Sequence, residues 1–173
     1  MSERTKRQGG AHGNLYALRG DVMHALRARG FRLPLGIYRT DPLLMAAICF
    51  GLDPGRFHWD RERIFVAWNA GWSFKPLRWW HLDDLRAHMK RMGRQAQGWL
   101  ETQAIKQHLA IDRRLPETFP RTAAELVGQW IRTFPKAARH AYLTNPLSFL
   151  ARRRLLAPRD WSLATRPPKL ISQ

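Results

Sequence analysis

The clearest pattern in the sequence is an apolar stripe between residues 82 and 109. Hydrophobic residues recur there at intervals of three and four positions: Leu82, Leu85, Met89, Met92, Ala96 and Leu100. This spacing places the side chains on one side of an α-helix, so we predict one long amphipathic helix over residues 82–109. The opposite side of that helix carries Arg86, Lys90, Arg94 and Gln97, so its positive charge is presented in a row.

Four shorter helices are predicted from apolar runs and their flanking residues. They cover residues 21–29, 42–50, 123–134 and 146–156. Gly30 and Gly51 supply C-terminal stops to the first two, and Pro135 ends the third. The first begins at Asp21, a residue type that favours helix starts.

Strand-like pieces alternate with these helices. Residues 15–18 form a short strand candidate, and residues 63–68 are rich in aromatic and β-branched side chains. Residues 70–75 alternate well enough to pair with 63–68 in a β-hairpin. We therefore predict an α+β fold of short strands and a hairpin packed with helices. It forms a single domain over residues 14–157, between an N-terminal segment (1–13) and an extended tail (158–173).

The composition is that of a folded, strongly basic protein. The chain has 173 residues, of which 45% are hydrophobic, and it contains 30 Lys and Arg against 13 Asp and Glu. The formal net charge of +17 favours polyanionic partners: nucleic acid, anionic lipid head groups or phosphorylated small molecules. Any single basic cluster is also compatible with a solvated surface.

Cysteine content and the N-terminus predict a location. Cys49 is the only cysteine and lies inside an apolar run, which indicates a buried, inert thiol in a reducing compartment. The N-terminus has no apolar signal region, and no stretch reaches the roughly 20 apolar residues that cross a bilayer. We predict a cytoplasmic protein that is not secreted, with contact to a membrane surface as an open option.

Asp41 is the acid that the sequence singles out. It stands between a basic loop and the apolar run 42–50, and Pro42 follows it. Asp is a good N-cap, and Pro suits the first helical position, so a structural role is one interpretation. The other is that Asp41 takes a proton from a substrate. The two roles are compatible.

Several kinds of catalytic site are excluded by spacing. The seven His form no tight pair, and Cys49 has no second cysteine, so no metal site is predicted. The sequence also lacks a serine nucleophile elbow, a glycine-rich phosphate loop and a dinucleotide fingerprint.

Three segments carry a resemblance to a known family. Residues 14–19 (Asn-Leu-Tyr-Ala-Leu-Arg), residues 33–41 (Leu-Pro-Leu-Gly-Ile-Tyr-Arg-Thr-Asp) and residues 94–100 (Arg-Gln-Ala-Gln-Gly-Trp-Leu) follow one another in the order seen in one group of enzymes. The region 13–110 resembles the acceptor-side half of an inverting GT-A glycosyltransferase of the large family-two group. Thr40 and Asn14 stand where that family usually has Glu and Gly.

The resemblance implies roles for individual residues. Asp41 matches the catalytic base, which deprotonates the acceptor hydroxyl as it attacks the anomeric carbon of a nucleotide sugar. Arg94, Gln95 and Trp99 match a later Gln-x-x-Arg-Trp type motif, and Tyr38 and Arg39 lie beside the base. We therefore expect these five residues to contact the acceptor, although a buried helix anchor is the other interpretation of Trp99.

The family's nucleotide-binding half has no counterpart here. That half ends in an Asp-x-Asp that holds Mg²⁺ or Mn²⁺ against the diphosphate, and this sequence contains no Asp-x-Asp. The resemblance thus implies no cofactor within this chain, and a divalent cation with a nucleotide sugar only where a separate donor-binding half is present. A donor-binding partner or a homo-oligomer is expected, because exposed apolar surface and free strand edges favour association.

Two other functions stay open. Aromatic residues interleaved with Arg, as in Arg78-Trp79-Trp80, and the pI near 11.5 favour a nucleic-acid-binding module without catalytic activity. The amphipathic helix predicted over 82–109 also has the character of a peripheral membrane helix that binds an anionic surface.

Overall fold

The fold is described by a computed structural model for residues 17–65, 78 and 80–162. The α-helices are α2 (Gly20–Ala28), α3 (Thr40–Cys49), α4 (Leu82–Lys106), α5 (Ala123–Thr133), α6 (Pro135–Thr144) and α7 (Leu147–Leu155). Shorter helical turns are η1 (Arg61–Arg63), η2 (Gln107–Ile111) and η3 (Pro116–Thr118). η2 is a π-helical continuation of α4, so the long helix predicted over 82–109 is confirmed.

The predicted α+β class is wrong. The described residues are mostly helical, and their only β-type pairing is an isolated parallel bridge between Leu35 and Thr122. Where the hairpin was expected, Arg61–Arg63 forms a 3₁₀ turn, because the Asp60 side chain accepts a hydrogen bond from the Glu62 amide. The remainder of that hairpin, residues 66–77, lies outside the described residues. Of the predicted strand 15–18, residues 17 and 18 are described and are not in a strand.

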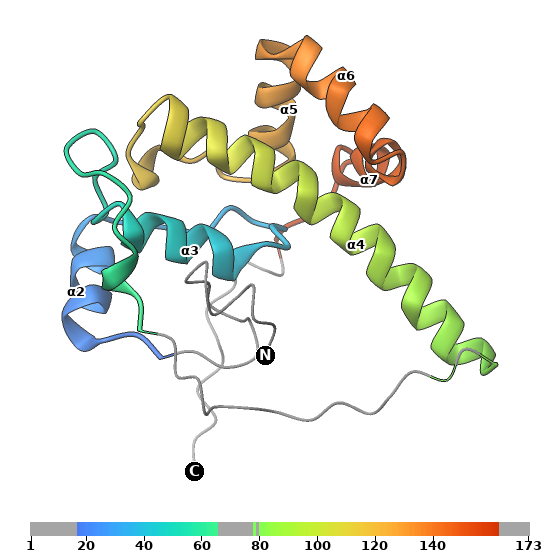
Figure 1. The fold of residues 1–173 in the computed structure, drawn as a ribbon, viewed down its shortest axis with the longest axis horizontal. Helices are drawn as coiled ribbons and strands as arrows, with labels where there is room; N and C mark the ends of the chain where they lie inside the picture. Colours follow the sequence, from blue (N-terminus) through green and yellow to red (C-terminus); the bar gives the residue numbers. More distant parts are fainter. Residues whose placement is uncertain (1–16, 66–77, 79, 163–173) are drawn as a thin grey trace.

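Helix α4 is the central element (Figure 1). Helices α2 and α3 lie on one side of it, and α5, α6 and α7 lie on the other. Buried side chains from α3, α4, α5, α6 and α7 form the main core, which includes Leu43, Leu100, Leu109, Val127 and Trp130. A second cluster joins α2 to α3 through Leu26, Leu44, Met45 and Ile48.

Neighbouring residues in the sequence fix where α5 and α6 begin. Thr122 and Glu125 form a capping box: the Thr122 hydroxyl accepts from the Glu125 amide at 3.1 Å, and the Glu125 carboxylate accepts from the Thr122 amide at 3.2 Å. Pro135 ends α5 as predicted, but it also begins α6, a helix that the sequence analysis missed. Pro suits a first helical position because its missing N–H would have no partner there.

Cys49 is fully buried at the end of α3, as predicted. Burial, with a smaller contribution from Asp60, raises the pKa of its thiol to about 11. The thiol therefore stays protonated at neutral pH, and this supports the expectation of an inert side chain.

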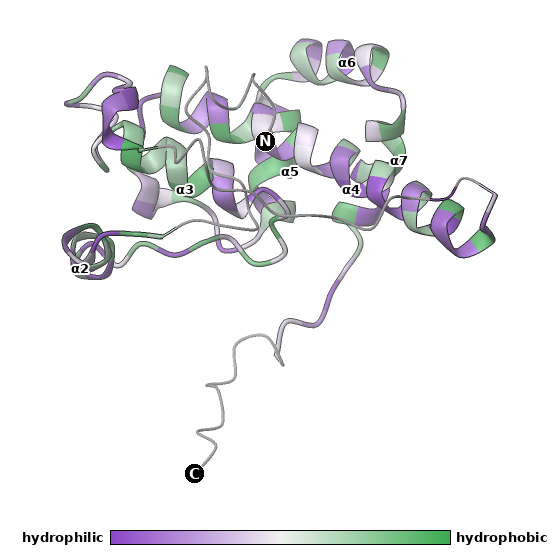
Figure 2. Ribbon diagram, turned by 60° about the horizontal axis from the view of Figure 1, so that its bottom comes forward, coloured by the Kyte–Doolittle hydropathy of each residue, from purple (hydrophilic) through white to green (hydrophobic). Residues whose placement is uncertain are grey.

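The described part of α4 does not pack along its whole length. Its last part lies in the core, whereas its N-terminal end projects away from the other helices (Figures 1 and 2). The predicted stripe is therefore divided. Ala96 and Leu100 are buried, but Leu82, Leu85, Met89 and Met92 are exposed.

Candidate functional site

The loop that precedes α3 packs against the middle of α4. This brings together two of the three segments that carry the family resemblance, residues 33–41 and 94–100. The contact is made by Gln97, Gly98 and Glu101, which share one side of α4 because they are spaced by three and four residues. We call residues 36–41, the end of this loop and the first two residues of α3, the acceptor loop, after the role that the family resemblance predicts for it.

Glu101 holds the acceptor loop in place. Its side chain has no exposed surface. Its two carboxylate oxygens accept from the Tyr38 amide at 2.9 and 3.1 Å and from the Arg39 amide at 2.9 Å. The Gln97 amide group donates to Glu101 at 2.7 Å and to the Gly36 carbonyl at 3.2 Å. Two residues of α4 thus satisfy the loop's buried backbone groups, and we call this arrangement the Glu101 clasp.

Burial perturbs the Glu101 carboxyl. Loss of hydration raises its pKa above the ordinary value of 4.5, while the hydrogen bonds from Gln97, Tyr38 and Arg39 and the charge of Arg39 oppose that rise. Burial is the largest of these effects, so the net direction is upward.

The raised pKa predicts how pH changes stability. The folded protein binds the Glu101 proton more tightly than the unfolded chain does. The contribution of Glu101 to the free energy of unfolding therefore rises as pH falls from neutral toward 4.5. The Glu101→Gln variant does not titrate at this position, so comparing it with the natural protein cancels the contributions of other groups. We expect urea unfolding to show that the natural protein gains stability relative to Glu101→Gln between pH 7 and pH 5. Movement in the other direction would mean that the folded-state pKa is lowered.

Gly98 allows the acceptor loop to approach α4. A Cβ atom at this position would lie 2.6 Å from Arg39 Nε and 2.8 Å from Tyr38 Cδ1, closer than ordinary van der Waals contact. In the sequence, Gly98 weakens the helix by about 1 kcal/mol relative to Ala, which suggests close packing or a kink nearby. The structure explains its presence by close packing.

Gly98→Ala and Gly93→Ala form a matched pair in α4. At Gly93 the nearest atom to an added Cβ is Arg154 Nη1 at 3.4 Å, at the end of a flexible side chain. We therefore expect Gly93→Ala to stabilise the protein by up to about 1 kcal/mol. At Gly98 the same gain is opposed by overlap, which costs about 1–3 kcal/mol, so the net effect is destabilising. Urea unfolding of both variants tests this; equal stabilisation by both would contradict the close approach.

The residues predicted to contact the acceptor fall into two groups. Tyr38 and Arg39 lie on the acceptor loop, and Arg94 lies one helical turn before Gly98 on the same side of α4. Gln95 is exposed on another side of the helix. Trp99 is half-buried and packs against the main core, in agreement with its interpretation as a helix anchor.

Asp41 lies in the first turn of α3, but it is not the N-cap. Helix α3 begins at Thr40, Arg39 occupies the cap position, and no side chain makes a capping hydrogen bond there. The Asp41 side chain is half-buried and makes no hydrogen bond or ion pair with the described part of the chain. Its carboxylate is therefore not committed to a structural partner among these residues.

Two further residues belong to this site: Arg39 on the acceptor loop, and Trp161, which contacts Gly36. The Nε atom of Arg39 is buried and has no hydrogen-bond partner in the described residues. Trp161 packs on Gly36, where the positive φ of 76° and the closeness of the indole both require glycine.

Sequence reasoning missed Trp161, Gln97 and Glu101 as parts of this site. The i, i+4 spacing of Gln97 and Glu101 beside buried Leu100 is the signal that could have found the last two.

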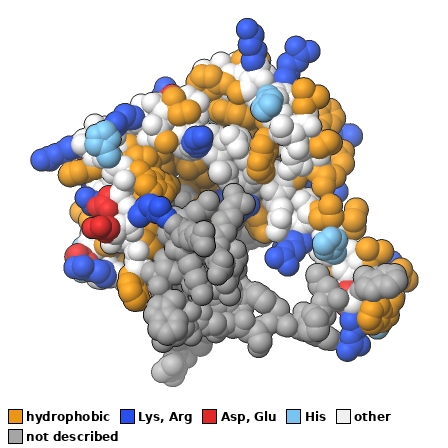
Figure 3. Space-filling model, viewed as in Figure 1, with side chains coloured by type: hydrophobic (Ala, Val, Ile, Leu, Met, Phe, Trp, Pro, Cys, Tyr) orange, Lys and Arg blue, Asp and Glu red, His pale blue; other side chains and the backbone are white. Residues whose placement is uncertain are grey.

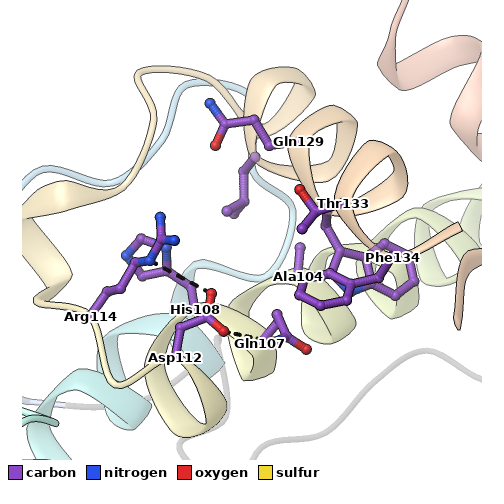
Figure 4. A pocket seen from close by; sticks show the side chains of 10 residues that line it. Ala104, Gln107, His108, Asp112, Arg114, Gln129, Thr133 and Phe134 are labelled. Atoms are coloured by element: carbon purple, nitrogen blue, oxygen red, sulfur yellow. Dashed lines mark hydrogen bonds and ion pairs between the residues drawn. The ribbon is translucent and has the colours of Figure 1, made fainter.

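A shallow hollow lies elsewhere, between the end of α4 and α5 (Figure 4). Asp112 accepts a hydrogen bond from Gln107 at 2.7 Å and lies 3.6 Å from Arg114 in an ion pair. His108 lines the hollow, and its Nε2 is 3.0 Å from the Thr118 hydroxyl and 3.3 Å from the Leu115 carbonyl. Burial lowers the pKa of His108. With its ring stacked on Phe119, this histidine joins η3 to α4 as a structural residue.

No group of three or more His, Cys, Asp or Glu side chains in the described residues is placed to hold a metal ion. Among the described helices, none is both long enough and apolar enough to cross a membrane. Comparison with protein-family models, with curated proteins and with solved structures gives no match.

Proposed function

We propose that this chain provides the acceptor side of a sugar-transfer site, with Asp41 as the base. The observation that carries the proposal is the Glu101 clasp, which joins the loop bearing Asp41 to the helix segment bearing Arg94. These segments are more than fifty residues apart in the sequence, and the family resemblance assigns roles to residues in both of them. Their packing against one another supports the proposal.

The proposed step is a single displacement. Asp41 accepts the proton of an acceptor hydroxyl, the hydroxyl oxygen forms a bond to the anomeric carbon, and the bond from that carbon to the nucleotide diphosphate breaks. Arg39 and Arg94 supply positive charge beside the reacting groups, and Tyr38 offers an aromatic face for a sugar ring. Gln97 and Glu101 position the loop but do not touch the acceptor.

The proposal assigns the donor to a partner. Because the sequence has no Asp-x-Asp, the nucleotide sugar and its divalent cation would be held by a separate donor-binding half. The acceptor loop would then lie at the contact between the two halves.

The test is an activity assay with a side-by-side variant. The full chain, purified together with any protein that co-purifies from its own cells, is incubated with a panel of nucleotide sugars, Mg²⁺ and a cell extract as acceptor source. Mass spectrometry then detects hexose addition. The proposal expects transfer that requires Asp41. Transfer that survives Asp41→Asn, or no transfer with any donor in the panel, would overturn it.

Nucleic-acid binding is a second candidate, and one specific observation favours it. No acidic residue occurs between Glu125 and Asp160, a stretch that forms most of α5 and all of α6 and α7. Exposed basic residues on these helices include Arg132, Lys136, Arg139, Arg153 and Arg154. A one-sign surface of this kind attracts phosphate backbones. Binding of a single-stranded oligonucleotide that falls steeply with salt, with no dependence on Asp41, would support this function in place of sugar transfer.

A further inference from the structure

The projecting end of α4 presents an apolar stripe that no described element covers. Its members, Leu82, Leu85, Met89 and Met92, follow one another at intervals of three and four residues. Leu82 is 70% exposed and Met89 is 59% exposed. Single exposed apolar residues are ordinary, but a contiguous row on one helix side marks an interaction surface. Figure 3 shows hydrophobic side chains gathered on this projecting end.

The charges on this end are arranged around the stripe. By helical spacing Arg86 lies beside one margin of the stripe, and Lys90, Arg94 and Arg91 lie progressively farther round the helix. Both acids of the first turn point away from the stripe by the same spacing, and Asp83 is paired with Arg86 at 3.5 Å. The segment from Arg78 to Arg94 contains five Arg and Lys against two Asp, and nearly all of these side chains are exposed.

We infer that the projecting end of α4 binds the surface of an anionic lipid bilayer. An interfacial helix buries an apolar side in the acyl boundary while Lys and Arg contact acidic head groups, and this segment has both features. Its axis would lie in the plane of the membrane, with Leu85 and Met89 at the centre of the buried side and Arg86 and Lys90 at the head-group level.

Other occupants match the surface less well. A second copy of this helix would cover the stripe, but it would bring a second set of cations against the first, which is unfavourable. A nucleic acid would neutralise Arg86 and Lys90, but phosphates give the apolar stripe no partner. An anionic bilayer satisfies the charge and the apolar side together.

The experiment measures binding of the full chain to lipid vesicles by sedimentation. Vesicles of phosphatidylcholine with about one-third phosphatidylserine are compared with phosphatidylcholine alone. We expect clear preference for the anionic vesicles. Leu85→Gln combined with Met89→Gln should weaken that binding by about tenfold or more, and Arg86→Gln combined with Lys90→Gln should weaken it to a similar degree.

A matched control is available at the other end of the same helix. Ile111 is 59% exposed, the same fraction as Met89, but lies in η2, away from the projecting end. Ile111→Gln should leave vesicle binding within about twofold of the natural protein. Because all these positions are exposed, circular dichroism should report an unchanged helix content for each variant.

Four outcomes would overturn the inference. One is failure of the natural protein to bind anionic vesicles. The second is unchanged binding when Leu85 and Met89 are both replaced, since that would reduce the effect to charge alone. The third is an equal loss from Ile111→Gln, which would mean that any exposed apolar residue matters. The fourth is displacement of the protein from vesicles by an oligonucleotide, where replacing Arg86 and Lys90 abolishes the displacement and replacing Leu85 and Met89 does not change it. That result would assign the surface to nucleic acid.

Discussion

Asp41→Asn is expected to reduce sugar transfer by about 100-fold or more while leaving the fold intact. A positioned general base contributes about 10²–10⁴-fold to a reaction rate, and the Asn amide cannot accept the proton. The carboxylate makes no hydrogen bond or ion pair with the described residues, and it does not cap α3. Little stability therefore depends on its charge. Initial rates of hexose addition at saturating donor, with thermal unfolding of the same samples, measure both effects.

Asp83→Asn is the matched control for this substitution. Asp83 also lies in the first turn of a helix, α4, but it is exposed on the projecting end, far from the acceptor loop. Each change removes one negative charge near a helix N-terminus, which alters stability by about 0.3–1 kcal/mol. A similar loss of activity in both variants would show that the loss of a negative charge near a helix N-terminus, not the loss of a base at Asp41, is responsible.

The helices could be predicted from sequence because their signals are local. The three- and four-residue spacing of residues 82–109 and the Thr122 to Glu125 capping box depend only on neighbours along the chain. The missed helix α6 shows the limit of such signals. Pro135 stops one helix and starts another, and the sequence pattern indicated only the stop.

The strand prediction failed because residue preference is a weak guide where burial decides. Ile64 and Phe65 are residue types that favour strands, but Phe65 is largely exposed and follows a 3₁₀ turn fixed by Asp60. Strand preference reflects packing on a half-buried sheet, and no such sheet exists in the described residues. The division of α4 into a buried and a projecting part could not be predicted either, since the apolar spacing is continuous through it.

The candidate site was predicted in part. The resemblance selected the acceptor loop and residues 94–100, which lie together in the structure. It did not identify Glu101, because a glutamate in a helix with basic neighbours is normally a solvated side chain. Only the fold shows that this carboxylate is buried against the loop amides. The same holds for Trp161, which is distant in sequence from Gly36.

Glu101→Ala is expected to be among the most destabilising substitutions in the described part of the chain. It would leave the part-buried amides of Tyr38 and Arg39 without acceptors, and an unsatisfied buried donor costs about 1–3 kcal/mol. It would also remove one of the two acceptors for Gln97 and leave a cavity. We expect a loss of about 3–5 kcal/mol, a large share of the 5–15 kcal/mol that stabilises a typical domain.

Two variants separate the clasp from a general effect of losing a glutamate. Glu125→Ala removes a glutamate that also accepts from a backbone amide, but at an exposed capping box, where the cost is about 1 kcal/mol. Glu101→Gln keeps the shape and one acceptor oxygen but turns an NH₂ group toward donors, so its cost should lie between the two alanine variants. Urea unfolding at neutral pH gives this order. If Glu101→Ala costs no more than Glu125→Ala, the acceptor loop is held by its apolar contacts, and the clasp does not fix the position of Asp41.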